Sequence, residues 1–65
     1  MKVSELLNLM ALWDDVLITD AVTADELHYG TVERVPWEIR SKDAYAIHIE
    51  DDMTLHIEVT HEHAI

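Results

Sequence analysis

Residues 44–60, AYAIHIEDDMTLHIEVT, decide the fold, because apolar and polar side chains alternate on both sides of an acidic segment. Such period-two alternation is typical of strands that bury one face, so the stretch predicts a single β-hairpin. Its apolar face carries Tyr45, Ile47, Ile49, Leu55, Ile57 and Val59, and its polar face carries His48, Glu50, His56 and Glu58. We expect the preceding residues to cover the apolar face.

The register of the hairpin follows from the same alternation. The apolar side chains of the two strands share a face only when the two residue numbers in each cross-strand pair add up to an even number. A three-residue loop over residues 51–53 meets this condition, although Met53 is a poor substitute for the glycine that such loops favour. A five-residue loop would keep the same parity. The predicted pairs are Ile49 with Leu55, Ile47 with Ile57, Tyr45 with Val59, and His48 with His56.

The N-terminal segment Lys2–Leu12 predicts a helix, with Ser4 as its N-cap. Its apolar stripe consists of Val3, Leu6, Leu7, Met10 and Trp13. Leu9 and Leu12 widen the apolar surface beyond this stripe. They are candidates for self-association, and the alternative is that they pack under a loop.

Two strands and a short helical turn are predicted between the N-terminal helix and the hairpin. The strands span residues 15–20 and 27–35 and are expected to be antiparallel, with a bulge at Gly30. Pro36–Ser41 predicts one helical turn, from which Trp37 would cover an end of the sheet. The predicted fold class is therefore α+β, with an N-terminal helix packed on a small antiparallel sheet of about four strands.

The composition indicates one domain over residues 1–65, near the lower size limit for folding alone. The chain has no cysteine, so neither a disulfide nor a thiolate metal site supplements its core. Self-association is a common remedy for a thin core, and a homodimer is one expectation.

Fourteen acidic residues against four basic ones give a formal net charge of −10. Such a chain is repelled by nucleic-acid phosphates and by anionic membrane surfaces. No apolar run approaches the roughly 18 residues of a membrane span, and no signal-peptide pattern is present. The sequence therefore predicts a soluble cytoplasmic protein that does not bind nucleic acid directly.

The order of the predicted elements resembles that of small proteins from bacterial phages and mobile elements, common among Gram-positive hosts. The matching residues are Val3-Ser4-Glu5-Leu6-Leu7, Asp15-Val16-Leu17-Ile18, Tyr29-Gly30-Thr31-Val32, Val35-Pro36 and Leu55-His56-Ile57-Glu58-Val59. The group often has glycine near the final turn, where this chain has Met53. The resemblance implies a phage-like setting and no catalytic residues.

His48 and His56 are the candidate metal ligands, because the predicted register places them opposite each other. Cross-strand neighbours lie about 5 Å apart at Cβ, close enough for two imidazoles to share a zinc or nickel ion. His61 and His63 could form a second, weaker site. The alternative is that these histidines are solvated side chains on an open face. Nearby carboxylates would favour protonated histidine, so a pH sensor is a further possibility.

An enzyme is not predicted. The sequence has no cysteine nucleophile, no glycine-rich phosphate loop and no HExxH pattern, and a chain of this size has little volume for a substrate pocket. We therefore expect no catalytic residues and no cofactor.

The acidic surface is the remaining feature that suggests a function. It can steer the protein onto a basic partner and occupy a groove meant for nucleic acid. Small acidic phage-type proteins that block CRISPR effectors or restriction enzymes work in this way. The alternative is charge that only keeps a small domain soluble. The candidate partner-binding residues are Glu50, Asp51, Asp52, Glu58, Asp20, Asp25 and Glu26.

Overall fold

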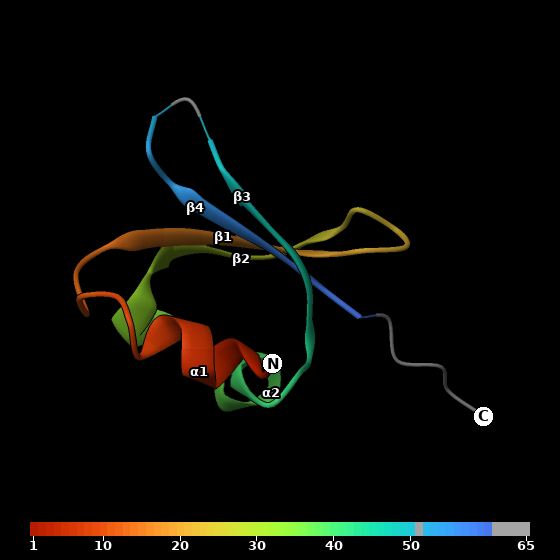
Figure 1. The fold of residues 1–65 in the computed structure, drawn as a ribbon, viewed down its shortest axis with the longest axis horizontal. Coiled ribbons are helices and arrows are strands. Elements are labelled where there is room, and N and C mark those ends of the chain that lie inside the picture. The colour runs from red at the N-terminus through yellow and green to blue at the C-terminus, as the bar shows by residue number, and fades with distance from the viewer. Residues whose placement is uncertain (51, 61–65) are drawn as a thin grey trace.

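A computed structural model describes residues 1–50 and 52–60 and has an α+β fold (Figure 1). Its elements are α1 (Val3–Leu7), β1 (Asp15–Asp20), β2 (Glu26–Thr31), the 3₁₀ turn η1 (Val32–Arg34), α2 (Trp37–Arg40), β3 (Ala44–Ile49) and β4 (Leu55–Val59). The four strands form one sheet in the order β2-β1-β4-β3. In the described part of the chain, no helix is long and apolar enough to cross a membrane.

The sheet consists of two antiparallel hairpins joined through their inner strands. β1 pairs with β2, and β3 pairs with β4, both antiparallel. The inner strands β1 and β4 run parallel, with Ile18 beside Ile57. The prediction of an α+β fold with about four strands is therefore confirmed, while the sheet is mixed rather than wholly antiparallel.

The core lies between one face of the sheet and a thin layer of short helices (Figure 1). The buried residues are Val3, Leu6, Leu7, Val16, Ile18, Val32, Val35, Ile39, Ile57 and Val59. Arg40 donates from Nε to the carbonyl of Val35 and from Nη2 to that of Val32, at 2.9 and 2.7 Å. These bonds tie α2 to the turn before it. Among residues 1–50 and 52–60, no helix lies over the other face of the sheet.

The N-terminal helix is much shorter than predicted. It ends at Leu7 rather than Leu12, since 3₁₀-type bonds from Leu9 N–H and Met10 N–H tighten its last turn. Its N-cap is Lys2, whose N–H donates to Glu5 Oε1 at 3.0 Å, so the assignment of Ser4 as the cap was wrong.

The chain that follows α1 exposes two of the residues assigned to its apolar surface. A hydrogen bond from Asp14 N–H to the carbonyl of Ala11 and one from Ala11 N–H to Asp14 Oδ2 turn the chain toward β1. Trp13 is consequently 79% exposed instead of lying in the core. Leu12 is exposed as well, rather than packed under a loop.

The second strand also ends earlier than predicted, at Thr31 instead of Val35, because the chain enters η1. The bulge lies in the interval between Glu26 and His28, not at Gly30. Gly30 pairs with Val16 and has φ of +151°, a conformation that residues with side chains rarely adopt.

The hairpin register is confirmed over most of its length. Ile49 pairs with Leu55, Ile47 with Ile57 and His48 with His56. Glu50 N–H donates to the carbonyl of Thr54 at 2.9 Å, and Met53 adopts a positive φ of 70°. The pairing of Tyr45 with Val59 was wrong, because a bulge places Ala44 opposite Val59.

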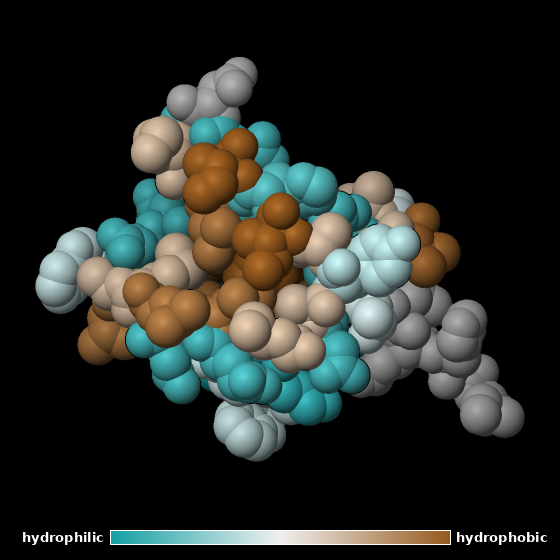
Figure 2. Space-filling view, in the orientation of Figure 1, coloured by the Kyte–Doolittle hydropathy of each residue, from teal (hydrophilic) through white to brown (hydrophobic). Residues whose placement is uncertain are grey.

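The helical layer does not cover the whole apolar face. Ile47 lies opposite the core residue Ile57, and Ile49 lies opposite Leu55, which packs against the core, yet both Ile47 and Ile49 are exposed. In Figure 1 the β3–β4 hairpin rises away from α1 and α2, and Figure 2 shows hydrophobic side chains gathered on the surface between hairpin and helix. Trp37 is also exposed, so it does not cover an end of the sheet.

Two isoleucines of the hairpin test this distribution of packing. Ile57 is fully buried and Ile49 is 67% exposed. We expect Ile57→Ala to lower the free energy of unfolding by about 2–5 kcal/mol, since it leaves a cavity, and Ile49→Ala to lower it by less than about 1 kcal/mol. Urea denaturation followed by circular dichroism measures both. Equal losses would contradict the described core.

Candidate protein-binding face

One row of side chains crosses the uncovered face of the sheet, which we call the open face. Tyr29 of β2 pairs with Leu17 of β1, Leu17 with His56 of β4, and His56 with His48 of β3. An exposed aromatic ring and two imidazoles therefore lie in line across four strands. The row forms because each of these residues is directly paired with the next one on the adjacent strand.

Each histidine in this row is bonded to a carboxylate on the other strand of the hairpin. His48 Nε2 lies 2.5 Å from Glu58 Oε2, and His56 Nδ1 lies 2.8 Å from Glu50 Oε1. His56 Nε2 also contacts Thr19 Oγ1 of β1 at 2.8 Å. Each glutamate is thus diagonal to the histidine that it contacts, and these hydrogen bonds orient both carboxylates on the open face.

The same contacts bear on the metal hypothesis for His48 and His56. Their ring centroids are 5.4 Å apart, as expected for cross-strand neighbours. However, both nitrogens of His56 and one of His48 already contact Glu50, Thr19 and Glu58. Within residues 1–50 and 52–60, no group of three or more His, Asp or Glu side chains is placed to hold a metal ion. A metal site at these two histidines stays a prediction, and His61 and His63 lie outside the described residues.

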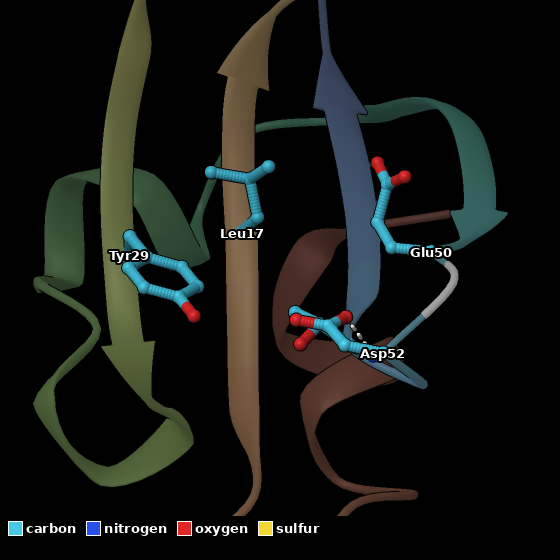
Figure 3. A pocket seen from close by; sticks show the side chains of 5 residues that line it. Leu17, Tyr29, Glu50 and Asp52 are labelled. Carbon is cyan, nitrogen blue, oxygen red and sulfur yellow. Dashed lines mark hydrogen bonds between the residues drawn. The ribbon is translucent and has the colours of Figure 1, made fainter.

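A pocket of about 350 Å³ opens beside this row (Figure 3). Leu17 and Tyr29 line one side of it, and Glu50, Asp52 and Thr54 line the other. Leu17 and Tyr29 come from the first hairpin and the other three residues from the second. The pocket therefore combines an apolar wall with an aromatic ring and two carboxylates.

Asp52 is fixed by the turn that contains it. The backbone N–H of Thr54 donates to Asp52 Oδ1 at 3.0 Å, and this bond holds the pKa of the Asp52 carboxyl below its ordinary value of 3.8. Asp52 is consequently ionised at neutral pH. Its negative charge lies at the end of the sheet where β1 begins.

Two further acidic residues lie at the same end. Asp14 and Asp15 line a second pocket, of about 290 Å³, together with Asp52 and Thr54. Asp14, Asp15, Leu17 and Tyr29 were not among the residues predicted for the site. The parallel pairing of β1 with β4 brings all of them near the final turn, and no local pattern in the sequence indicates that pairing.

The predicted partner-binding residues are divided between the two ends of the sheet. Asp20 pairs with Val59, at the end opposite the final turn, and its Oδ1 accepts the N–H groups of Val22 and Thr23 at 2.8 and 2.9 Å. Asp25 and Glu26 are exposed near Asp20, in the connection to β2 and at its start. The structure thus brings Glu50 and Asp52 together in one pocket. Glu58 lies beside Thr19, toward the end of the sheet that carries Asp20, Asp25 and Glu26, and Asp51 lies outside the described residues.

The two residues proposed for self-association are both at the surface. Leu9 is 81% exposed and Leu12 is 56% exposed. They lie in the segment that connects α1 to β1. The protein therefore has two chemically different surfaces available for contacts, one acidic and one apolar.

The lowered pKa of Asp52 predicts a pH-dependent contribution to stability. A carboxyl whose pKa is lower in the folded state stabilises the fold above the pKa of the unfolded chain, about 3.9, and this contribution is lost as the pH falls through the lowered value. We expect Asp52→Asn to melt at a lower temperature than wild type at pH 7, and the difference to shrink below about pH 4.

Asp25→Asn is the matched control, since it removes one exposed carboxylate from a loop and thereby reports the general effect of net charge. Thermal melts of the three proteins between pH 7 and pH 3 measure the effect. A difference between Asp52→Asn and Asp25→Asn that did not change with pH would show that the charge of Asp52 does not stabilise the turn.

No protein-family model, curated protein or solved structure matches this chain. The similarity to phage and mobile-element proteins therefore stays a prediction from the sequence. What the chain can do must be inferred from the geometry of its two surfaces.

Proposed function

We propose that this protein is a non-enzymatic binding protein that docks its open face on a basic surface of another protein. One observation carries the proposal: Glu50 and Glu58 are oriented by hydrogen bonds with His56 and His48 on a sheet face that none of the helices in the described part of the chain covers (Figure 1). Fixed charges lose little side-chain entropy when a partner binds, so they favour recognition.

The distribution of basic residues supports the same proposal. Lys2 Nζ lies 3.1 Å from Asp43 Oδ1, and Arg40 donates to backbone carbonyls beside α2. These two bases therefore lie away from the open face. An excess of acidic over basic residues across the chain, 14 against 4, adds a long-range field that would steer a basic partner toward this protein.

The sharpest form of this proposal is an inhibitor that mimics the charge of nucleic acid. Such a protein would occupy the basic groove of a nucleic-acid-handling enzyme, as acidic phage-type proteins do against CRISPR effectors and restriction enzymes. The resemblance of the sequence to phage and mobile-element proteins supports this form. Charge that serves only solubility would need no fixed arrangement of Glu50 and Glu58.

The experiment that tests the proposal is affinity capture from host lysate at low and at high salt. We expect a basic nucleic-acid-handling protein to be retained at low salt and released at high salt, since exposed charge contacts are screened. The double variant Glu50→Lys and Glu58→Lys should reduce capture by at least tenfold.

The double variant Glu33→Lys and Glu38→Lys is the matched control, because it changes the net charge equally at exposed positions of η1 and α2. It should retain most of the capture. Capture that persisted at high salt, or that both double variants reduced equally, would contradict docking through the open face.

A second candidate function is self-association through the apolar surface. It is favoured by the exposure of the large apolar side chains of Leu9, Leu12, Ile47 and Ile49 on a small domain. The dimer would cover side chains that the short helices leave in water. Its function would then be structural.

Leu9→Glu and Leu12→Glu test this second candidate. Both side chains are exposed, so either change should leave the fold intact while placing a charge in the contact. We expect sedimentation equilibrium to show a dimer for wild type and a monomer for each variant. A wild-type protein that stayed monomeric at millimolar concentration would exclude the dimer.

A further inference from the structure

The pocket of Figure 3 is large enough to receive one long side chain. Its volume of about 350 Å³ is at the lower end of the range for ligand sites, which is about 300–1,000 Å³. It is open to solvent on the open face. A partner that docks there can therefore insert one residue without any rearrangement of the sheet.

We infer that this pocket takes the guanidinium group of an arginine side chain that the partner protein presents. The inference rests on the proposed function and specifies its chemistry. It identifies Tyr29, Leu17, Glu50 and Asp52 as the residues that recognise the partner.

The two carboxylates supply the charge for this site. Glu50 accepts from His56 through Oε1, and Asp52 accepts from Thr54 N–H through Oδ1. An ionised carboxylate has about four lone-pair sites, so each retains the capacity to accept further donors. The pocket lining contains none of the chain's lysines or arginines. A cation from a partner would therefore meet two fixed negative charges.

The aromatic and apolar wall discriminates between cations. Tyr29 is 57% exposed, so part of its ring is accessible, and Leu17 lies beside it on the adjacent strand. A guanidinium is planar, weakly hydrated and able to stack on an aromatic ring while donating to a carboxylate. An ammonium is a compact and strongly hydrated point charge. The combination of a ring with two carboxylates thus favours arginine over lysine.

The test compares two labelled probes of equal charge, a hexa-arginine and a hexa-lysine peptide, by fluorescence anisotropy at low salt. We expect hexa-arginine to bind at least fivefold more tightly. Tyr29→Leu should remove this preference, because it keeps an apolar residue on β2 but no ring, and Tyr29→Phe should keep it. Tyr45→Leu is the control, since Tyr45 is an exposed tyrosine outside the pocket.

A second pair of variants separates the pocket from the acidic face as a whole. Glu50 and Glu58 both pair with a histidine on the open face, but only Glu50 lines the pocket. We expect Glu50→Gln to weaken hexa-arginine binding at least fivefold and Glu58→Gln to weaken it less than twofold. Circular dichroism of each variant confirms folding, and the glutamine variants decide the question if Tyr29→Leu does not fold.

The outcomes distinguish the inference from the function on which it rests. Equal affinity for the two peptides, weakened equally by Glu50→Gln and Glu58→Gln, would overturn the arginine pocket and leave a diffuse acidic binding face. Failure of wild type to bind either peptide at low salt would overturn both the pocket and the acidic binding face.

Discussion

The parallel pairing of β1 with β4 is the contact on which the rest of the structure depends. Val16, Ile18 and Ile57 are fully buried in this strand pair, on the face that the helices cover. Without the β1–β4 pairing the strands would form two separate hairpins, and an isolated hairpin is only marginally stable in water. The β1–β4 pairing also determines the open face. It places Leu17 beside His56 and so brings Tyr29 and Leu17 of the first hairpin into line with His56 and His48 of the second.

The small size of the helical layer is the second constraint on the structure, because it limits how much of the sheet is covered. α1 has five residues and α2 has four, so together they cover the centre of the sheet but not its β3 edge. Ile47 and Ile49 consequently stay in water, although their cross-strand partners Ile57 and Leu55 belong to or contact the core. The exposed apolar surface is thus a consequence of how few helical residues this short chain provides.

The two sides of the sheet differ in how they are stabilised. The helical side depends on the burial of aliphatic groups, whereas the open face is ordered by hydrogen bonds from His48 and His56 to Glu58 and Glu50. These polar contacts are partly exposed, so each adds little to stability. They orient charged groups on the open face, which is why we propose that this face binds a partner.

The sequence by itself determined the local features. Alternation determined which face the hairpin residues from Ile47 to Ile57 occupy, and the parity of the loop determined the pairing of His48 with His56. The bulge between Ala44 and Ala46, which displaced Tyr45 from its predicted partner, was not indicated by that alternation. Only the tertiary structure decided where α1 ends and which strand lies beside β4. Alternation specifies a face but not a neighbour, since strand neighbours are selected by packing between distant segments. The pocket depends on that selection, because Tyr29 and Leu17 come from one hairpin and Glu50 and Asp52 from the other.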